Sequence, residues 1–130
     1  MRAAMLVLAL LSGIGAVTLG GCGRAPSAAI ASGGYSVLDA GDQPLRAAFN
    51  RDTGHVRLMF LVDPICPDCL RGLADMGDDL LSTLPRDARL NVYVVYEPVI
   101  GGTAKDIPAA AALLKTSLAH NYWNPTGDFG

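Results

Sequence analysis

The 130-residue sequence predicts an α/β fold in which parallel strands alternate with helices in the order βαβαβα. Two apolar runs of strand length, Val56 to Val62 and Leu90 to Tyr96, flank a segment in which leucines recur three and four residues apart. The connections between these elements are short. Strand, helix and strand in such close succession are typical of parallel strands joined by a right-handed crossover.

The predicted domain begins near Tyr35 with a short strand at 35–38. After a turn-like segment at 39–42, we expect a helix over 43–50, closed by the turn residues "NRDTG". Its apolar residues share one helical face, namely Leu45, Ala48 and Phe49.

The strand predicted at 56–62 is apolar apart from Arg57, as expected for a strand covered on both faces. The leucine-rich segment 70–84 then predicts an amphipathic helix that ends before Pro85. Because residues 90–96, "LNVYVVY", are β-branched and aromatic, they predict a second buried strand. A last helix is expected over 106–119, followed by an aromatic and turn-rich tail.

The N-terminus has the layout of a secretory signal over residues 1–21, with an uncharged stretch from Ala3 to Leu19. The sequence Leu19-Gly20-Gly21-Cys22 resembles the lipobox of bacterial lipoproteins, which implies that Cys22 is lipidated and becomes the first mature residue. An uncleaved anchor helix is the alternative. Residues 22–34 are small and Gly/Ser/Ala-rich, so we expect a flexible tether to a domain at 35–130. Both alternatives place that domain on the extracytoplasmic face of the membrane.

Composition indicates one packed domain, with 51% hydrophobic and 17% charged residues. Removal of Arg2 with the signal leaves nine basic residues against twelve acidic ones, a net charge of about −3. This balance gives no support for nucleic-acid binding, which shows a basic footprint.

Lipidation of Cys22 leaves Cys66 and Cys69 as an isolated pair that could be a redox centre, a metal clip or a structural bridge. A purely structural disulfide is the weaker hypothesis, because so short a loop contributes little chain entropy. At a helix start, the free N–H groups lower the pKa of the first cysteine, so Cys66 is the candidate nucleophile. Cys69 is placed to resolve a mixed disulfide. Pro67 destabilises the helix little, because a backbone N–H in the first turn has no partner within the helix.

The chain from Tyr35 to Gly130 resembles the thioredoxin superfamily, specifically membrane-tethered bacterial thioredoxin-like proteins. The resemblance lies in "LRAAFNRDTGHVRLMFLVDPICPDCLRG", "LNVYVVYEPVIGG" and "NYWNPTG". It implies a thiol-disulfide oxidoreductase in the periplasm with Cys66 and Cys69 as its active site. Protein thiols and disulfides are its expected substrates, a separate redox partner recycles the pair, and no cofactor is expected.

Two departures from that family carry further predictions. Asp68 between the cysteines and Asp63 before them should oppose thiolate formation if their side chains are close, which favours a reductant or isomerase over a strong oxidant. The family's C-terminal hairpin and last helix have no counterpart, so we expect an incomplete C-terminus. That leaves the strand at 56–62 on a sheet edge, to be covered by a partner strand or a dimer if the chain is complete.

Other residues leave alternatives open. His120 with Cys66 and Cys69 could bind copper, as in thioredoxin-fold copper-delivery proteins, because soft thiolates select Cu(I). A zinc site is disfavoured since only two cysteines and two scattered histidines are available. A non-catalytic binding platform is a third class. Asp63 could handle protons or cap a turn, while Glu97 could face the site but is expected to be a solvated strand end. Buried packing is expected for Tyr122 and Trp123 rather than a substrate groove.

Overall fold

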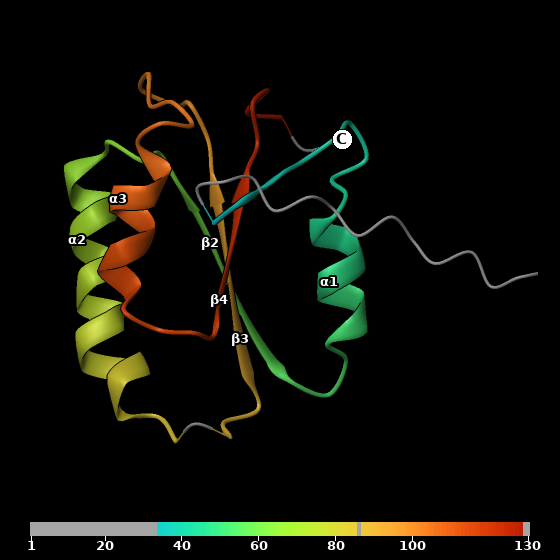
Figure 1. The fold of residues 1–130 in the computed structure, drawn as a ribbon, viewed down its shortest axis with the longest axis vertical. Helices are drawn as coiled ribbons and strands as arrows, with labels where there is room; N and C mark the ends of the chain where they lie inside the picture. The colour runs from blue at the N-terminus through green and yellow to red at the C-terminus, as the bar shows by residue number, and fades with distance from the viewer. Residues whose placement is uncertain (1–33, 86, 129–130) are drawn as a thin grey trace, which may run out of the picture.

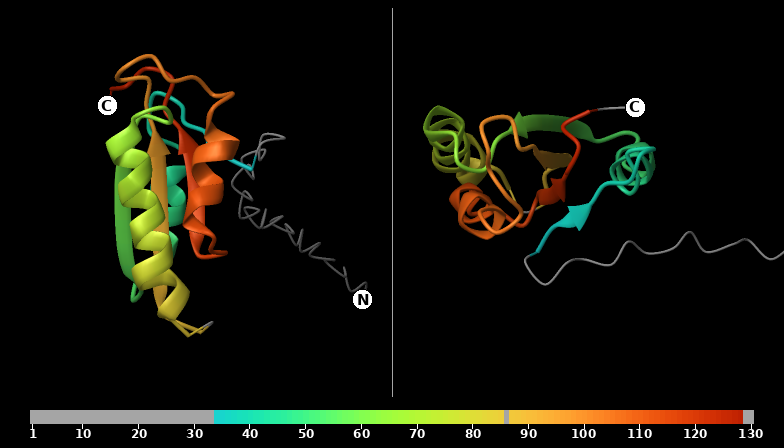
Figure 2. Two further views of the ribbon diagram at one scale, coloured as in Figure 1. Left: turned by 90° about the vertical axis from the view of Figure 1, so that its left-hand side faces the viewer. Right: turned by 90° about the horizontal axis from the view of Figure 1, so that it is seen from above.

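The computed structural model describes residues 34–85 and 87–128, which form one parallel sheet with helices on both faces (Figure 1). The strands are β1 (Ser36–Val37), β2 (Val56–Val62), β3 (Leu90–Tyr96) and β4 (Ala119–Trp123). The α-helices are α1 (Leu45–Arg51), α2 (Pro67–Asp75) and α3 (Ile107–Ala111). Helices α2 and α3 cover one face and α1 lies on the other (Figure 2). The predicted α/β class with parallel strands is confirmed.

The strand order is β1-β4-β3-β2, and each neighbouring pair is parallel. Strand β4 corrects the prediction, because residues 119–123 were expected to be the end of a helix and an unassigned tail. The helical segment instead ends after a short 3₁₀ turn at 112–114, where Lys115 adopts a left-handed conformation with φ of 51°. The chain then turns back to pair β4 between β3 and β1.

Strand β3 forms the centre of the core, as predicted for 90–96. Its seven residues alternate between the two faces of the sheet, and six of them are buried. Val92, Val94 and Tyr96 pack with residues of α2 and α3, whereas Tyr93 and Val95 pack with α1. Tyr122 is buried on the α1 side and Trp123 packs against the other cluster, so their predicted packing role is confirmed.

Strand β2 lies at the edge of the sheet, as expected for residues 56–62, but the prediction that it is covered on both faces is wrong. Only Val62 is fully buried, while Val56, Met59 and Leu61 are 62%, 43% and 53% exposed. The residues facing α2, among them Leu58 and Phe60, pack against the core. The opposite face is open because the seven-residue α1 packs over β3 and β4 instead.

The helix predicted from the leucines at 70–84 starts at Pro67, between the two cysteines, and continues beyond α2 as a π turn at 76–80 and a 3₁₀ turn at 81–83. Gly77 allows this segment to approach the end of the α3 region. A Cβ at Gly77 would lie 2.8 Å from the Leu114 carbonyl oxygen and 2.9 Å from that of Leu113. The close approach therefore requires glycine.

Candidate functional site

Three buried polar residues directly follow three neighbouring strands. Asp63, Glu97 and Asn124 come immediately after β2, β3 and β4, and they are only 3%, 9% and 3% exposed. All strands are parallel and in register at this end, so the three residues share the carboxyl edge of the sheet. Sites in α/β proteins commonly form at this edge.

The cysteine pair lies at the same edge, where β2 leads into α2. Cys66 and Cys69 are at disulfide distance, with their Cα atoms 5.2 Å apart. Cys66 is the N-cap residue of α2, with extended backbone geometry. Its Sγ accepts a hydrogen bond from the Cys69 backbone N–H at 3.3 Å. The predicted helix start at the cysteines is therefore confirmed.

This geometry has a chemical consequence for the reduced pair. The Cys69 N–H and the positive end of the α2 dipole both favour negative charge on the Cys66 sulfur. Both cysteines are partly exposed, so a second sulfur can reach them from solvent. Pro67, which opens α2 and is exposed, leaves no N–H without a partner.

Asp63 joins the loop before the cysteines to the loop after β3. Its Oδ2 accepts hydrogen bonds from the backbone N–H of Ile100 at 2.7 Å and of Gly102 at 3.3 Å. Its Oδ1 accepts from Ile65 N–H at 3.0 Å. Burial alone would raise the pKa of Asp63, but these amide donors outweigh it and hold the pKa below its ordinary value of 3.8.

The hydrogen bond from Ile65 N–H agrees with the turn role that the sequence offered for Asp63 beside proton handling, but the bridge to a loop 37 residues away was not predicted. The available signal was the glycine pair in "EPVIGGT". A Cβ at Gly102 would lie 2.6 Å from Cδ of Pro64, so only glycine lets the loop come so close. Asp63 and Gly102 are therefore positioning residues for the cysteine loop.

Glu97 is buried, which corrects the expectation of a solvated strand end. Its backbone N–H donates to the Val62 carbonyl at 2.9 Å, while its side-chain Oε1 has no hydrogen-bond partner among the described residues. Burial raises the pKa of Glu97 above its ordinary value of 4.5; Asn124 partly offsets this effect and the charge of Asp128 adds to it.

Asp68 projects from the outer surface of α2. Its Oδ1 forms an ion pair with the Arg71 guanidinium at 2.6 Å, and both side chains are exposed. Arg71 thus neutralises part of the charge that was expected to oppose a thiolate at Cys66. The Asp63 carboxylate is likewise occupied by backbone donors, so neither anion is free to act at full strength on the sulfur.

His120 lies away from the cysteines. It pairs in register with Tyr93 of β3, which pairs with Met59, and its ring stacks on the Tyr93 ring at 5.6 Å. His120 is thus two strands away from β2, a lateral separation of about 10 Å. Along the strand direction it is level with Met59, which lies seven residues before Cys66. His55 lies near Asn91, with 3.1 Å between Nδ1 and Nδ2. Within 34–85 and 87–128, no group of three or more His, Cys, Asp or Glu residues could hold a metal ion.

Exposed apolar side chains lie in the cysteine loop and in the loop that Asp63 bonds to it. Ile65 directly precedes Cys66 and is 41% exposed. Val99 and Ile100, which are 71% and 60% exposed, lie in the loop that Asp63 ties to the same place. Contiguous exposed apolar surface is typical of contact sites for other proteins.

Comparisons with known proteins give no family assignment: no family model, no curated protein and no solved structure matches this chain. The predicted signal, lipidation at Cys22 and tether fall outside the described residues. Among the residues that are described, no helix has the length and apolar character needed to cross a membrane.

Proposed function

We propose that this protein is a thiol-disulfide oxidoreductase of thioredoxin-like type, with Cys66 as nucleophile and Cys69 as resolving cysteine. The observation that carries the proposal is the geometry of the pair. Two partly exposed cysteines lie at disulfide distance at the start of a helix, at the carboxyl edge of a parallel sheet. A purely structural disulfide does not require an exposed position at a helix start.

The proposed exchange has two steps. The Cys66 thiolate attacks a sulfur of a substrate disulfide, forming a mixed disulfide and releasing one substrate thiolate. The Cys69 thiolate then attacks the Cys66 sulfur, forming the Cys66–Cys69 disulfide and releasing the second substrate thiolate. The substrate gains two electrons, the pair loses two, and a separate thiol redox partner returns the pair to the dithiol.

The apolar surface of Ile65, Val99 and Ile100 supports proteins as the substrate class, since a polypeptide segment can bury it. Asp68 lies in the first turn of α2, where a negative charge next to Cys66 favours the thiol over the thiolate. We therefore propose a reductant or isomerase rather than a strong oxidant. The ion pair with Arg71 limits this effect.

Location belongs to the same proposal. The lipobox-like Leu19-Gly20-Gly21-Cys22 supports a lipid anchor at Cys22 on the extracytoplasmic face of a bacterial membrane. In that compartment a dithiol cycles between its two states only if a redox partner supplies electrons.

The test is to trap the first step. Cys69→Ser removes the resolving thiol, so mixed disulfides at Cys66 should accumulate with a disulfide-bonded client protein and should disappear with dithiothreitol. Cys66→Ser is the matched control and should trap far less, because the remaining Cys69 lies inside α2 rather than at its N-cap. Equal trapping by both variants would contradict the assigned roles, and no trapping by either would contradict the function.

A further inference from the structure

The outer backbone edge of strand β2 pairs with no other strand among the described residues. The Val56 N–H donates to Arg89 and the Val62 carbonyl accepts from Glu97, so even-numbered residues direct their backbone groups toward β3. The N–H and C=O groups of Arg57, Met59 and Leu61 therefore point outward. Figure 2 shows no described element beside this edge.

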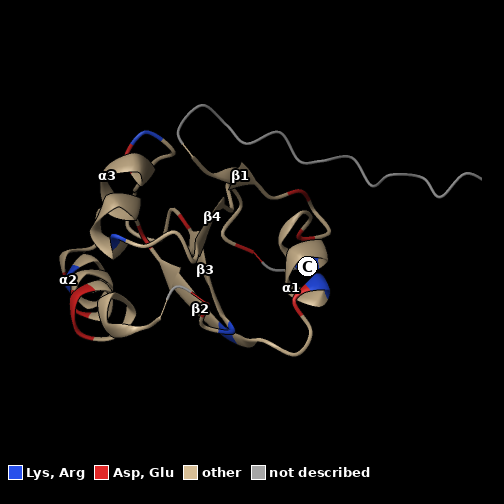
Figure 3. Cartoon of the chain, turned by 60° about the horizontal axis from the view of Figure 1, so that its bottom comes forward, with Lys and Arg blue, Asp and Glu red and all other residues tan. Residues whose placement is uncertain are grey.

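Strand β2 itself lacks the proline and the bulge that often protect an edge strand, and its pairing with β3 is regular along all seven residues. Its one charged residue, Arg57, is turned toward α1: the guanidinium lies 4.1 Å from the centre of the Phe49 ring, and Nη1 donates to the Phe49 carbonyl at 2.8 Å. Figure 3 shows acidic residues on α2, and no such cluster along β2.

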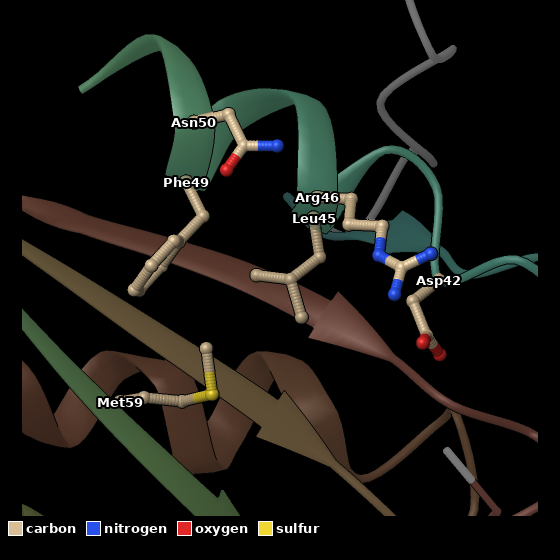
Figure 4. Close-up of a pocket in the computed structure, with 6 residues that line it drawn as sticks. All are labelled: Asp42, Leu45, Arg46, Phe49, Asn50 and Met59. Carbon is tan, nitrogen blue, oxygen red and sulfur yellow. The ribbon is translucent and has the colours of Figure 1, made fainter. Parts of the chain in front are cut away.

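The open face of β2 is apolar as well. Met59 and Leu61 are exposed on the α1 side, and Met59 borders a hollow of about 200 Å³. In Figure 4, Leu45 and Phe49 of α1 and Met59 of β2 point into this hollow. In the part of the chain that the structure describes, an unpaired edge and an exposed apolar face thus occur on the same strand.

We propose that β2 pairs antiparallel with β2 of a second copy, about a two-fold axis at Met59, to form a continuous eight-stranded sheet. This register is the one that pairs every outward residue: Met59 faces Met59 of the partner copy, and Arg57 faces the partner's Leu61. Six backbone hydrogen bonds form, no like charges oppose one another, and Phe60 meets the partner's Leu58 on the other face. The two-fold symmetry makes the interface closed.

The arrangement leaves the redox site free. Antiparallel strands place the two Cys66–Cys69 pairs beyond opposite ends of the paired strands, so they do not contact each other. Dimerisation therefore stands apart from the proposed activity, and it should persist when both cysteines are replaced.

A site-specific cross-link tests the register in the full chain, in mild detergent, with Cys22, Cys66 and Cys69 replaced by serine. The two residues at the axis have Cα atoms about 5.5 Å apart, within the range of a disulfide, so Met59→Cys should cross-link on oxidation. Leu61→Cys is the matched control, because its two copies lie about 14 Å apart along the strands and should stay monomeric. Cross-linking of the control without Met59→Cys would overturn the register.

Sedimentation and hydrogen exchange test the interface independently of that chemistry. Met59→Lys places like charges opposite one another and should weaken dimerisation by at least about tenfold, whereas Val99→Lys, which adds the same charge outside β2, should not. The Arg57, Met59 and Leu61 amides should be protected in the dimer and lose protection on dilution. A monomer at all concentrations would overturn the proposal, whether those amides exchange freely or are covered by another segment of the same chain.

Discussion

Asp63 and Glu97 are buried carboxyl groups at the ends of neighbouring strands, but their pKa values are displaced in opposite directions. The Asp63 carboxylate has three backbone N–H donors, so its charged form is stabilised. Burial favours the neutral form of Glu97, whose Oε1 has no hydrogen-bond partner among the described residues. Sequence patterns identified both positions as strand ends. They could not show that the amide donors of Asp63 come from a loop more than 30 residues away, or that Glu97 is buried.

Asp63→Asn is predicted to destabilise the fold in a pH-dependent way. The folded-state pKa of Asp63 is lowered, so its contribution is present above the ordinary value of 3.8 and is lost as the pH falls through the folded-state pKa. At pH 7 the variant should be less stable by about 1–3 kcal/mol, the range for charged hydrogen bonds. Urea denaturation of both proteins between pH 7 and pH 2.5 measures the difference, which should shrink at the acid end. A difference that does not change with pH would refute the bridge.

Glu97→Gln is the matched variant, and its predicted change in stability has the opposite sign. The folded-state pKa of Glu97 is raised above 4.5, so its ionisation costs stability as the pH rises from there through the folded-state pKa. The glutamine variant should therefore be more stable than the natural protein at pH 7 by about 1 kcal/mol, with the gain absent below pH 4.5. Lower stability at pH 7 would mean that the carboxylate has a partner that stabilises its charge.

At the scale of the elements, the hydrophobic periodicity predicted those strands and helices whose own residues carry a clear pattern. The apolar runs of β2 and β3 match the predicted bounds, and the leucine spacing predicted the α2 segment. Strand β4 was missed because "AHNYW" follows directly on a helical pattern, and the reversal at Lys115 leaves no glycine or proline as a signal. The position of β2 at a sheet edge agrees with the prediction, but its open face toward α1 was not predicted, because an apolar run does not show which faces of its strand are covered.

Gly77 and Gly72, both on the α2 segment, give a prediction at this scale. Gly77→Ala should cost about 1–3 kcal/mol, because the added methyl meets the carbonyl oxygens of Leu113 and Leu114. Gly72→Ala meets nothing within 4 Å and should stabilise the helix by up to about 1 kcal/mol. Thermal unfolding of the two variants compares them directly, and equal effects would contradict the close approach of α2 to the α3 region.

At the scale of the whole molecule, the two surfaces on which the proposals rest lie in different places on the described domain. The carboxyl edge of the sheet holds the cysteine pair, the buried carboxyl groups and the exposed apolar loop residues. The β2 edge holds the unpaired backbone groups. The copper alternative would need His120 and the cysteines in one place, and the sheet separates them.

The reduction potential of the Cys66–Cys69 pair tests the central claim most directly. Equilibration of the full chain with glutathione buffers, followed by acid quenching and thiol alkylation, gives the fraction oxidised. We predict full exchange with a potential between about −180 and −270 mV, the range of isomerases and reductants. A value near about −120 mV, as in strong oxidants, would contradict the proposed direction, and a pair that never exchanges with the buffer would contradict the redox function itself.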